Sequence, residues 1–150
     1  MSDKDLDEVS KIIDINKDAS DFYHDAQEKA ESPTVKDIFK DYEQLHKSVV
    51  IELQNYVSQK GGDPEAGNTF AGQAGEVWGK VRAALSPNVD ESLITSLEEA
   101  EDRCIHSIDD AIANDDLSPE TRVALKKQQE TLHKSHDYMK IMKENVNAAA

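Results

Sequence analysis

The residues best suited to chemistry in this chain belong to two tetrapeptides in which a histidine follows a glutamate by three positions. They are Glu43 to His46 and Glu130 to His133. On a helix this spacing places the carboxylate and the imidazole on one face, where both can bind the same metal ion. Iron, manganese and zinc accept such mixed oxygen and nitrogen ligands. The two tetrapeptides therefore suggest a metal site between neighbouring helices.

Four long amphipathic helices are predicted to position these side chains, because apolar residues recur at steps of three and four. The predicted helices span residues 6–31, 33–60, 90–113 and 119–146. Ser-Pro pairs precede or begin the second and fourth helices, and Gly61 and Gly62 end the second. Short turns within each pair of helices make the members antiparallel. The sequence thus predicts a single all-α domain over residues 1–150, an antiparallel four-helix bundle.

The segment between the second and third helices, residues 61–88, breaks this rhythm. It contains a glycine-rich stretch and then a short amphipathic segment over residues 76–85. A connection of this length is too long for a hairpin and is typical of a crossover along a bundle. We expect a short extra helix here, with Trp78 packing it against the core.

Several positions on the predicted apolar stripes hold polar residues, which indicates a polar layer in the core. Its expected members are Ser20, His46, Glu101 and His136. Counting from the turns puts Ser20 opposite His46, and Glu101 roughly opposite the segment from Leu132 to His136. A buried carboxylate has to be paired, metal-bound or protonated. Two interpretations stay open: a polar layer satisfied by its own hydrogen bonds, or a metal site. The metal ligands would be Glu43, His46, Glu101, Glu130 and His133.

Two features weigh against an intact two-metal centre. The first predicted helix has no glutamate on its buried face, since position 20 is a serine, and Glu130 projects away from the apolar stripe of its own helix. A single weak site for iron, manganese or zinc is the remaining metal hypothesis. Phosphotransfer through His46 or His133, each followed by lysine and serine, matches the required pattern only in part. Cys104, on the buried stripe, is expected to be a small core residue.

Composition and charge exclude several classes of partner. The chain carries a formal net charge of −14, which disfavours binding to nucleic acid and to anionic membrane surfaces. Its apolar runs are too short for a membrane span. One cysteine and no signal-peptide pattern at the start lead us to expect a cytoplasmic protein. The closing run of alanines at 148–150 is expected to fray.

Further segments along the chain carry a resemblance to a known family. These are residues 18–23, 52–54 and 61–65, Trp78, Glu101-Asp102 and His136-Asp137. In order and spacing they resemble a family of small bacterial ferritin-like four-helix bundles of unknown function, sometimes described as stress-associated. The resemblance covers about residues 6–146 and implies a ferritin-like fold, an unestablished activity and association into homodimers through helix faces. This family usually has glutamate near position 20 and tends to lack histidine at positions 46 and 133.

Together these observations favour a non-enzymatic structural or stress-response protein with a polar core layer. The alternative is a metal-binding ferritin-like bundle, an oxidoreductase or a metal store, that uses the two Glu-x-x-His tetrapeptides. No cofactor is certain from the sequence. Bound iron, manganese or zinc would distinguish the two hypotheses.

Overall fold

The computed structural model describes residues 1–64 and 89–149, and all of its regular structure there is helical. The helices are α1 (Asp3–Lys29), α2 (Pro33–Gln59), α4 (Val89–Ile112) and α5 (Pro119–Ala149). The described residues contain no strand. The predicted all-α four-helix bundle is therefore confirmed for this part of the chain. The expected short helix over residues 76–85, with Trp78, lies outside the described residues.

Local capping explains where the helices begin and end. The Ser2 side chain accepts a hydrogen bond from the Asp5 backbone, and the Asp5 carboxylate accepts one from the Ser2 backbone, so α1 starts three residues earlier than predicted. Ser32 caps α2, whose first residue is Pro33. At the other end of α2, Gly61 has a φ of 78°. This left-handed conformation suits glycine and ends the helix as the sequence predicted.

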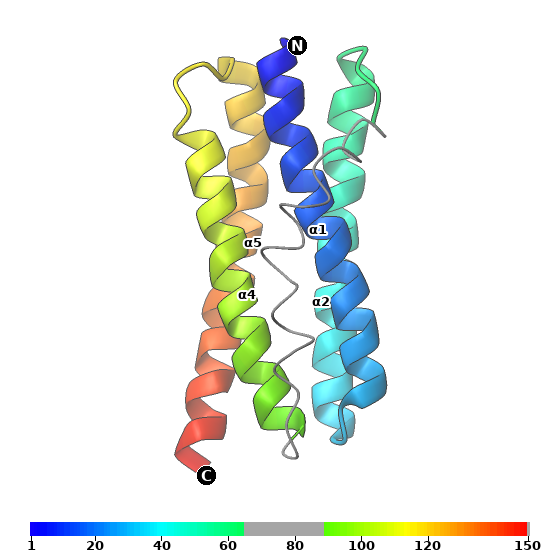
Figure 1. Ribbon diagram of the computed structural model, residues 1–150, viewed down its shortest axis with the longest axis vertical. Helices are drawn as coiled ribbons and strands as arrows, with labels where there is room; N and C mark the ends of the chain where they lie inside the picture. Colours follow the sequence, from blue (N-terminus) through cyan, green and yellow to red (C-terminus); the bar gives the residue numbers. More distant parts are fainter. Residues whose placement is uncertain (65–88, 150) are drawn as a thin grey trace.

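The helices form two antiparallel hairpins that lie side by side, with α1 next to α4 and α2 next to α5 (Figure 1). The Asp90 carboxylate at the start of α4 accepts from the backbones of Glu31 and Ser32, at 2.8 and 2.9 Å. At the opposite end, the Ser118 backbone donates to Asp5 at 3.0 Å. The turn between α1 and α2 thus meets the start of α4. It follows that α2 ends and α4 begins at opposite ends of the bundle.

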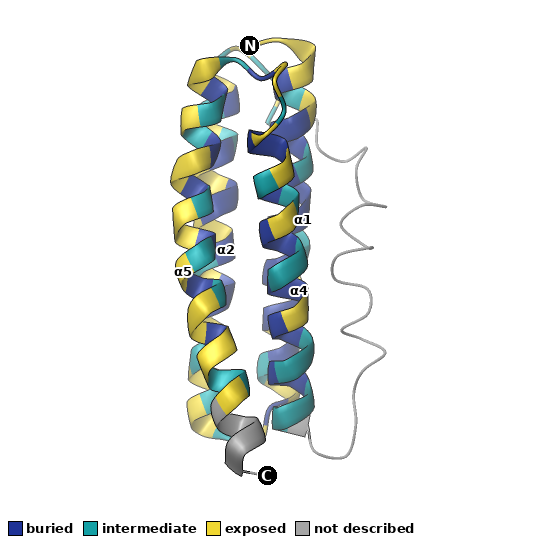
Figure 2. Cartoon of the chain, turned by 90° about the vertical axis from the view of Figure 1, so that its left-hand side faces the viewer, coloured by how far each residue is buried: buried dark blue, intermediate teal, exposed yellow. Residues whose placement is uncertain are grey.

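The core is aliphatic with a few aromatic rings, and the buried faces of all four helices point inward (Figure 2). Leu97, Ile108, Leu125, Leu132 and Met139 are completely inaccessible to solvent, at 0 % exposure each. Burial of this apolar surface is the main force that holds the hairpins together. No helix in the described part of the chain is both long and apolar enough to cross a membrane.

Candidate functional site

The candidate site is a buried polar layer in the middle of the aliphatic core, formed by side chains from three helices. Asn16 and Tyr23 come from α1, His46 from α2 and Glu101 from α4. All four are 0 % exposed. His46 joins them: its Nδ1 lies 2.6 Å from Asn16 Oδ1, and its Nε2 lies 2.6 Å from Glu101 Oε1. The Tyr23 hydroxyl donates to the same Glu101 oxygen at 2.6 Å. The layer therefore connects the α1–α2 hairpin to α4.

The hydrogen-bond partners determine most of the proton positions in this layer. Asn16 Nδ2 donates to the Ile12 carbonyl at 2.8 Å, so the Asn16 oxygen faces His46 and must accept. The His46 Nδ1 atom therefore carries a proton. Its Nε2 shares a second proton with Glu101, as an imidazolium and a carboxylate or as a neutral imidazole and a carboxylic acid. Either form leaves the pair with no net charge in a low-dielectric interior.

Aromatic rings pack against the layer. The Tyr23 ring stacks on His46 at a centroid distance of 5.5 Å and on Tyr42 at 5.2 Å. Burial, followed by the neighbouring charge of Glu101, raises the pKa of the Tyr23 phenol well above its usual value of 10.0. The Tyr23 hydroxyl therefore stays protonated and remains a hydrogen-bond donor. The Tyr42 hydroxyl donates to the Ser135 carbonyl at 2.6 Å, which ties α2 to α5.

Cys104 is one turn from Glu101 on α4 and is 1 % exposed. Burial, and then the Glu101 charge, raises the pKa of its thiol well above 9.0. A protonated and inaccessible thiol is a poor nucleophile. Cys104 therefore acts as a small core side chain.

One atom of the layer is left without a hydrogen bond. The second carboxylate oxygen of Glu101, Oε2, is buried and has no hydrogen-bond partner. An unsatisfied buried acceptor costs about 1–3 kcal/mol, so it marks a place where a water molecule or a cation would be stabilised. Within the layer, this oxygen is the feature that best fits a ligand.

The structure brings together only two of the five predicted metal ligands, His46 and Glu101. The Glu43 carboxylate instead lies at the seam between α1 and α2, where it accepts from Gln27 at 2.8 Å and Lys47 at 3.0 Å. Burial on its own would raise the Glu43 pKa, but these hydrogen bonds and the charges of Lys47 and His24 lower it below 4.5. Glu43 is therefore a carboxylate held by its own neighbours.

The second tetrapeptide is on the outside of α5. Glu130 is exposed, and His133 Nε2 lies 3.1 Å from a carboxylate oxygen of Asp109. The cause is helix geometry, since Leu132 occupies the core-facing position between them with 0 % exposure. Across the described residues, no group of three or more histidine, cysteine, aspartate or glutamate side chains is positioned to hold a metal ion.

Two expected members of the polar layer lie outside it. Ser20 is buried, but its hydroxyl donates to the Lys17 carbonyl of its own helix at 2.8 Å. His136 is at the edge of the α4–α5 contact, 3.4 Å from Glu98 and 3.5 Å from Asp102. Of the two histidines expected in the layer with Glu101, His46 and His136, the structure places His46 in contact with it. Leu132 and Met139, the α5 residues on either side of His136, are completely buried.

Helical periodicity puts both Asn16 and Tyr23 on the buried stripe of the first helix, but neither was among the expected members of the layer. Asn16 is a polar residue that comes just after Ile12, Ile13 and Ile15, and Tyr23 follows it by seven positions. Seven residues are almost two helical turns, so the two side chains share a face. They approach His46 and Glu101 from the same side. His46 is also too deeply buried to exchange a phosphoryl group with a partner protein.

Comparison with known proteins adds a family assignment. A family model described as a domain of unknown function (DUF2383) matches residues 4–114. The matched segment includes α1, α2 and α4, and with them all four members of the polar layer. No curated protein and no solved structure matches the chain.

Proposed function

The chain belongs to the DUF2383 family of domains of unknown function, and we propose that it is a non-enzymatic structural protein with a ferritin-like arrangement of helices. In this proposal the polar layer determines how the two hairpins dock. A role in stress response is the biological setting that the family resemblance implies. Since α2 ends and α4 begins at opposite ends of the bundle, the connectivity supports the ferritin-like part of the proposal, because such bundles contain one long crossover.

The observation that carries the structural proposal is the position of His46. Both of its ring nitrogens are engaged at 2.6 Å, and its side chain is 0 % exposed. A catalytic base or a metal ligand needs a free nitrogen and a route for its substrate or ion. The grooves between α2 and α5 are lined by other residues. His46 is better placed to hold helices in register than to react.

The alternative of a metal-binding bundle is favoured by one observation, the unpartnered Oε2 atom of Glu101. A cation bound there would use Glu101 and, after loss of a proton, His46. Iron, manganese and zinc are the candidates. Such an ion would take two protein ligands from the layer, so we expect weak binding at most.

The experiment is a measurement of metal content by plasma mass spectrometry on untagged protein purified without chelator, followed by titration with Fe(II), Mn(II) and Zn(II). The structural proposal predicts far less than one equivalent in both parts. A His46→Ala/Glu101→Ala double variant tests the layer, and Glu130→Ala/His133→Ala is the matched control because it removes the same residue types from an exposed position. Near-stoichiometric metal that disappears only in the first double variant would replace the structural proposal with the metal one.

A further inference from the structure

Charge is distributed unevenly between the two sides of the bundle. Counting from the sequence of each helix, α1 has nine acidic and four basic residues, and α4 has eight acidic and one basic. On the other side, α2 has four acidic and three basic residues, and α5 has four acidic and six basic. Figure 1 shows that α1 and α4 are neighbours, as are α2 and α5. The α1 and α4 helices are therefore strongly acidic, while α2 and α5 together are close to neutral. The outer surface formed by α2 and α5 is called the α2/α5 face below.

Exposed apolar side chains gather on the α5 part of the same near-neutral side. Among the described residues, three of the exposed large hydrophobic side chains belong to α5: Val123 at 67 %, Tyr138 at 52 % and Ile141 at 54 % exposure. At 100° per residue they lie within about 60° of one another around the helix, and Tyr138 lines the surface between α2 and α5. Single exposed apolar residues are common, but a cluster of three on a surface that also has little net charge is typical of an interface.

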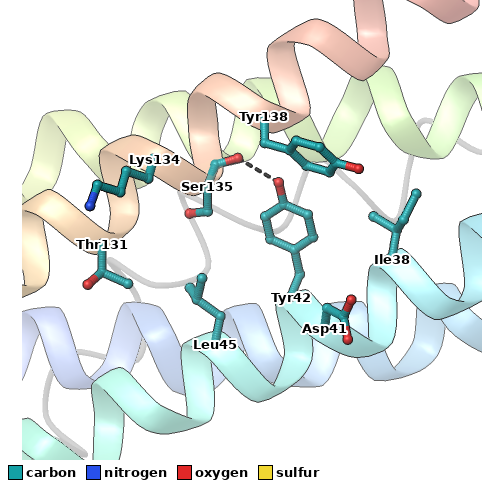
Figure 3. Close-up of a pocket in the computed structure, with 8 residues that line it drawn as sticks. All are labelled: Ile38, Asp41, Tyr42, Leu45, Thr131, Lys134, Ser135 and Tyr138. Atoms are coloured by element: carbon teal, nitrogen blue, oxygen red, sulfur yellow. Dashed lines mark hydrogen bonds between the residues drawn. The ribbon is translucent and has the colours of Figure 1, made fainter.

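The surface between α2 and α5 is also hollowed. A groove of about 470 Å³ lies between Tyr42 and Leu45 on α2 and Tyr138 on α5. Figure 3 shows the rings of Tyr42 and Tyr138 next to each other, with Lys134 and Asp41 toward opposite ends of the groove. A second hollow of about 250 Å³ continues along the same two helices beside Tyr56. Side chains from another surface can therefore fill this face.

We propose that the α2/α5 face binds the same face of a second copy of this chain, forming a two-fold symmetric dimer. The distribution of charge supports a second copy at this face. Two chains of −14 each repel one another, and repulsion is least where both present a near-neutral surface. A symmetric contact brings together the same patch of each copy. The near-neutral α2/α5 face of one copy would therefore contact the α2/α5 face of the other.

The size of the face is sufficient for a stable dimer. A helix of 27 residues such as α2 is about 40 Å long at 1.5 Å per residue. Two adjacent helices about 20 Å wide together present roughly 800 Å², which is close to the area each partner contributes to a standard-sized interface. Tyr138 and Ile141 would be buried within it, and buried aromatic and aliphatic side chains are the kind that contribute most to such contacts.

The dependence of binding on salt concentration distinguishes a second copy of this chain from a different, acidic protein as the partner of the α2/α5 face. Residual repulsion between two acidic copies is screened by added salt, so the dimer is expected to tighten as ionic strength rises. An acidic partner attracted by the lysines of α5 would bind more weakly under the same conditions.

The test is sedimentation velocity and light scattering of the full chain over a range of concentrations and at low and high salt. We expect a species of about twice the 16.7 kDa chain mass. Tyr138→Glu and Ile141→Glu each place a negative charge on the α2/α5 face, and we expect each to weaken dimerisation at least about tenfold. His106→Glu adds the same charge at an exposed position of α4 and is expected to leave the dimer unchanged. Circular dichroism verifies that each variant is folded.

Three outcomes would overturn the proposal. The first is a monomer at every concentration and salt condition. The second is a dimer that folded Tyr138→Glu and Ile141→Glu variants leave intact, which would place the contact elsewhere. The third is a dimer that His106→Glu disrupts as strongly as the α2/α5 substitutions. The proposal does not depend on the role of the polar layer, so its failure would leave the structural function untouched.

Discussion

His46 and His133 end the same Glu-x-x-His pattern, yet the fold gives them opposite surroundings. His46 is inaccessible and bonded through both ring nitrogens, while His133 is 45 % exposed and contacts Asp109 at 3.1 Å. The two glutamates differ as well, since Glu43 is buried at a helix seam and Glu130 is exposed. Identical spacing therefore produces a structural core residue in one helix and a surface ion pair in another. The helix face that carries the motif decides its role.

The largest expected difference between the two motifs is in stability. His46→Leu removes the partner of a buried carboxylate and leaves Glu101 without compensation, so we expect a loss of about 3–5 kcal/mol in the free energy of unfolding. Urea unfolding followed by circular dichroism measures it. A loss below about 1 kcal/mol would mean that Glu101 finds another partner or protonates at little cost.

A smaller effect is expected from the phenol that supports this pair. Tyr23→Phe keeps the ring stacked on His46 but removes the hydroxyl that donates to Glu101. We expect a loss of about 1–3 kcal/mol, because a hydrogen bond to a buried charged group is lost. Tyr56→Phe is the matched control, since its hydroxyl bonds a threonine at the edge of α5, and it should cost less. Equal losses in the two variants would contradict the special position of Tyr23.

The glutamates of the two motifs should also differ in their response to acid. The pKa of Glu43 is lowered below 4.5 by its hydrogen bonds and nearby cations, which outweigh burial. A depressed carboxylate pKa contributes stability above the unfolded value, and this stability is lost as pH falls through the folded value. We therefore expect Glu43→Gln to lose less stability than the parent between pH 5 and pH 3. Glu130→Gln, at an exposed position, should follow the parent curve, and thermal unfolding over this pH range distinguishes them.

The smallest effect belongs to the second histidine. His133→Leu removes a half-exposed contact with Asp109, which also accepts from Gln129 at 2.6 Å. Exposed ion pairs contribute about 0–1 kcal/mol, so the free energy of unfolding should change by less than about 1 kcal/mol. If His133→Leu lowered the free energy of unfolding as much as His46→Leu in the same urea assay, the two motifs would not differ in the way proposed.

The sequence predicted the bundle well because the fold follows from patterns within each helix. Stripes of Val, Ile and Leu, the Ser-Pro starts and the Gly61 stop are local signals, and each appears in the structure near its expected position. The start of α1 was misplaced because the cap by Ser2 depends on a reciprocal bond with Asp5. Hydrophobic periodicity alone does not report such a bond.

The site was predicted less completely because it depends on how helices face one another. The positions of His46 and Glu101 on buried stripes were visible, but their 2.6 Å contact depends on the rotation of α2 relative to α4. Counting residues from the turns located α5 against α4 only roughly, so both His46 and His136 stayed possible as partners of Glu101. Tyr23 was not assigned to the layer, since nothing in one sequence says where a phenol hydroxyl points.

The most direct test of the central claim is a double-mutant cycle between His46 and Glu101, using His46→Leu, Glu101→Leu and the double variant in urea unfolding. If the pair is a structural unit, each single change leaves a buried polar group unpaired, and the double change removes both. We predict that the double variant loses about 1–3 kcal/mol less than the sum of the two single losses. Additive losses, within about 0.5 kcal/mol, would contradict the account and show that the two side chains stabilise the bundle independently.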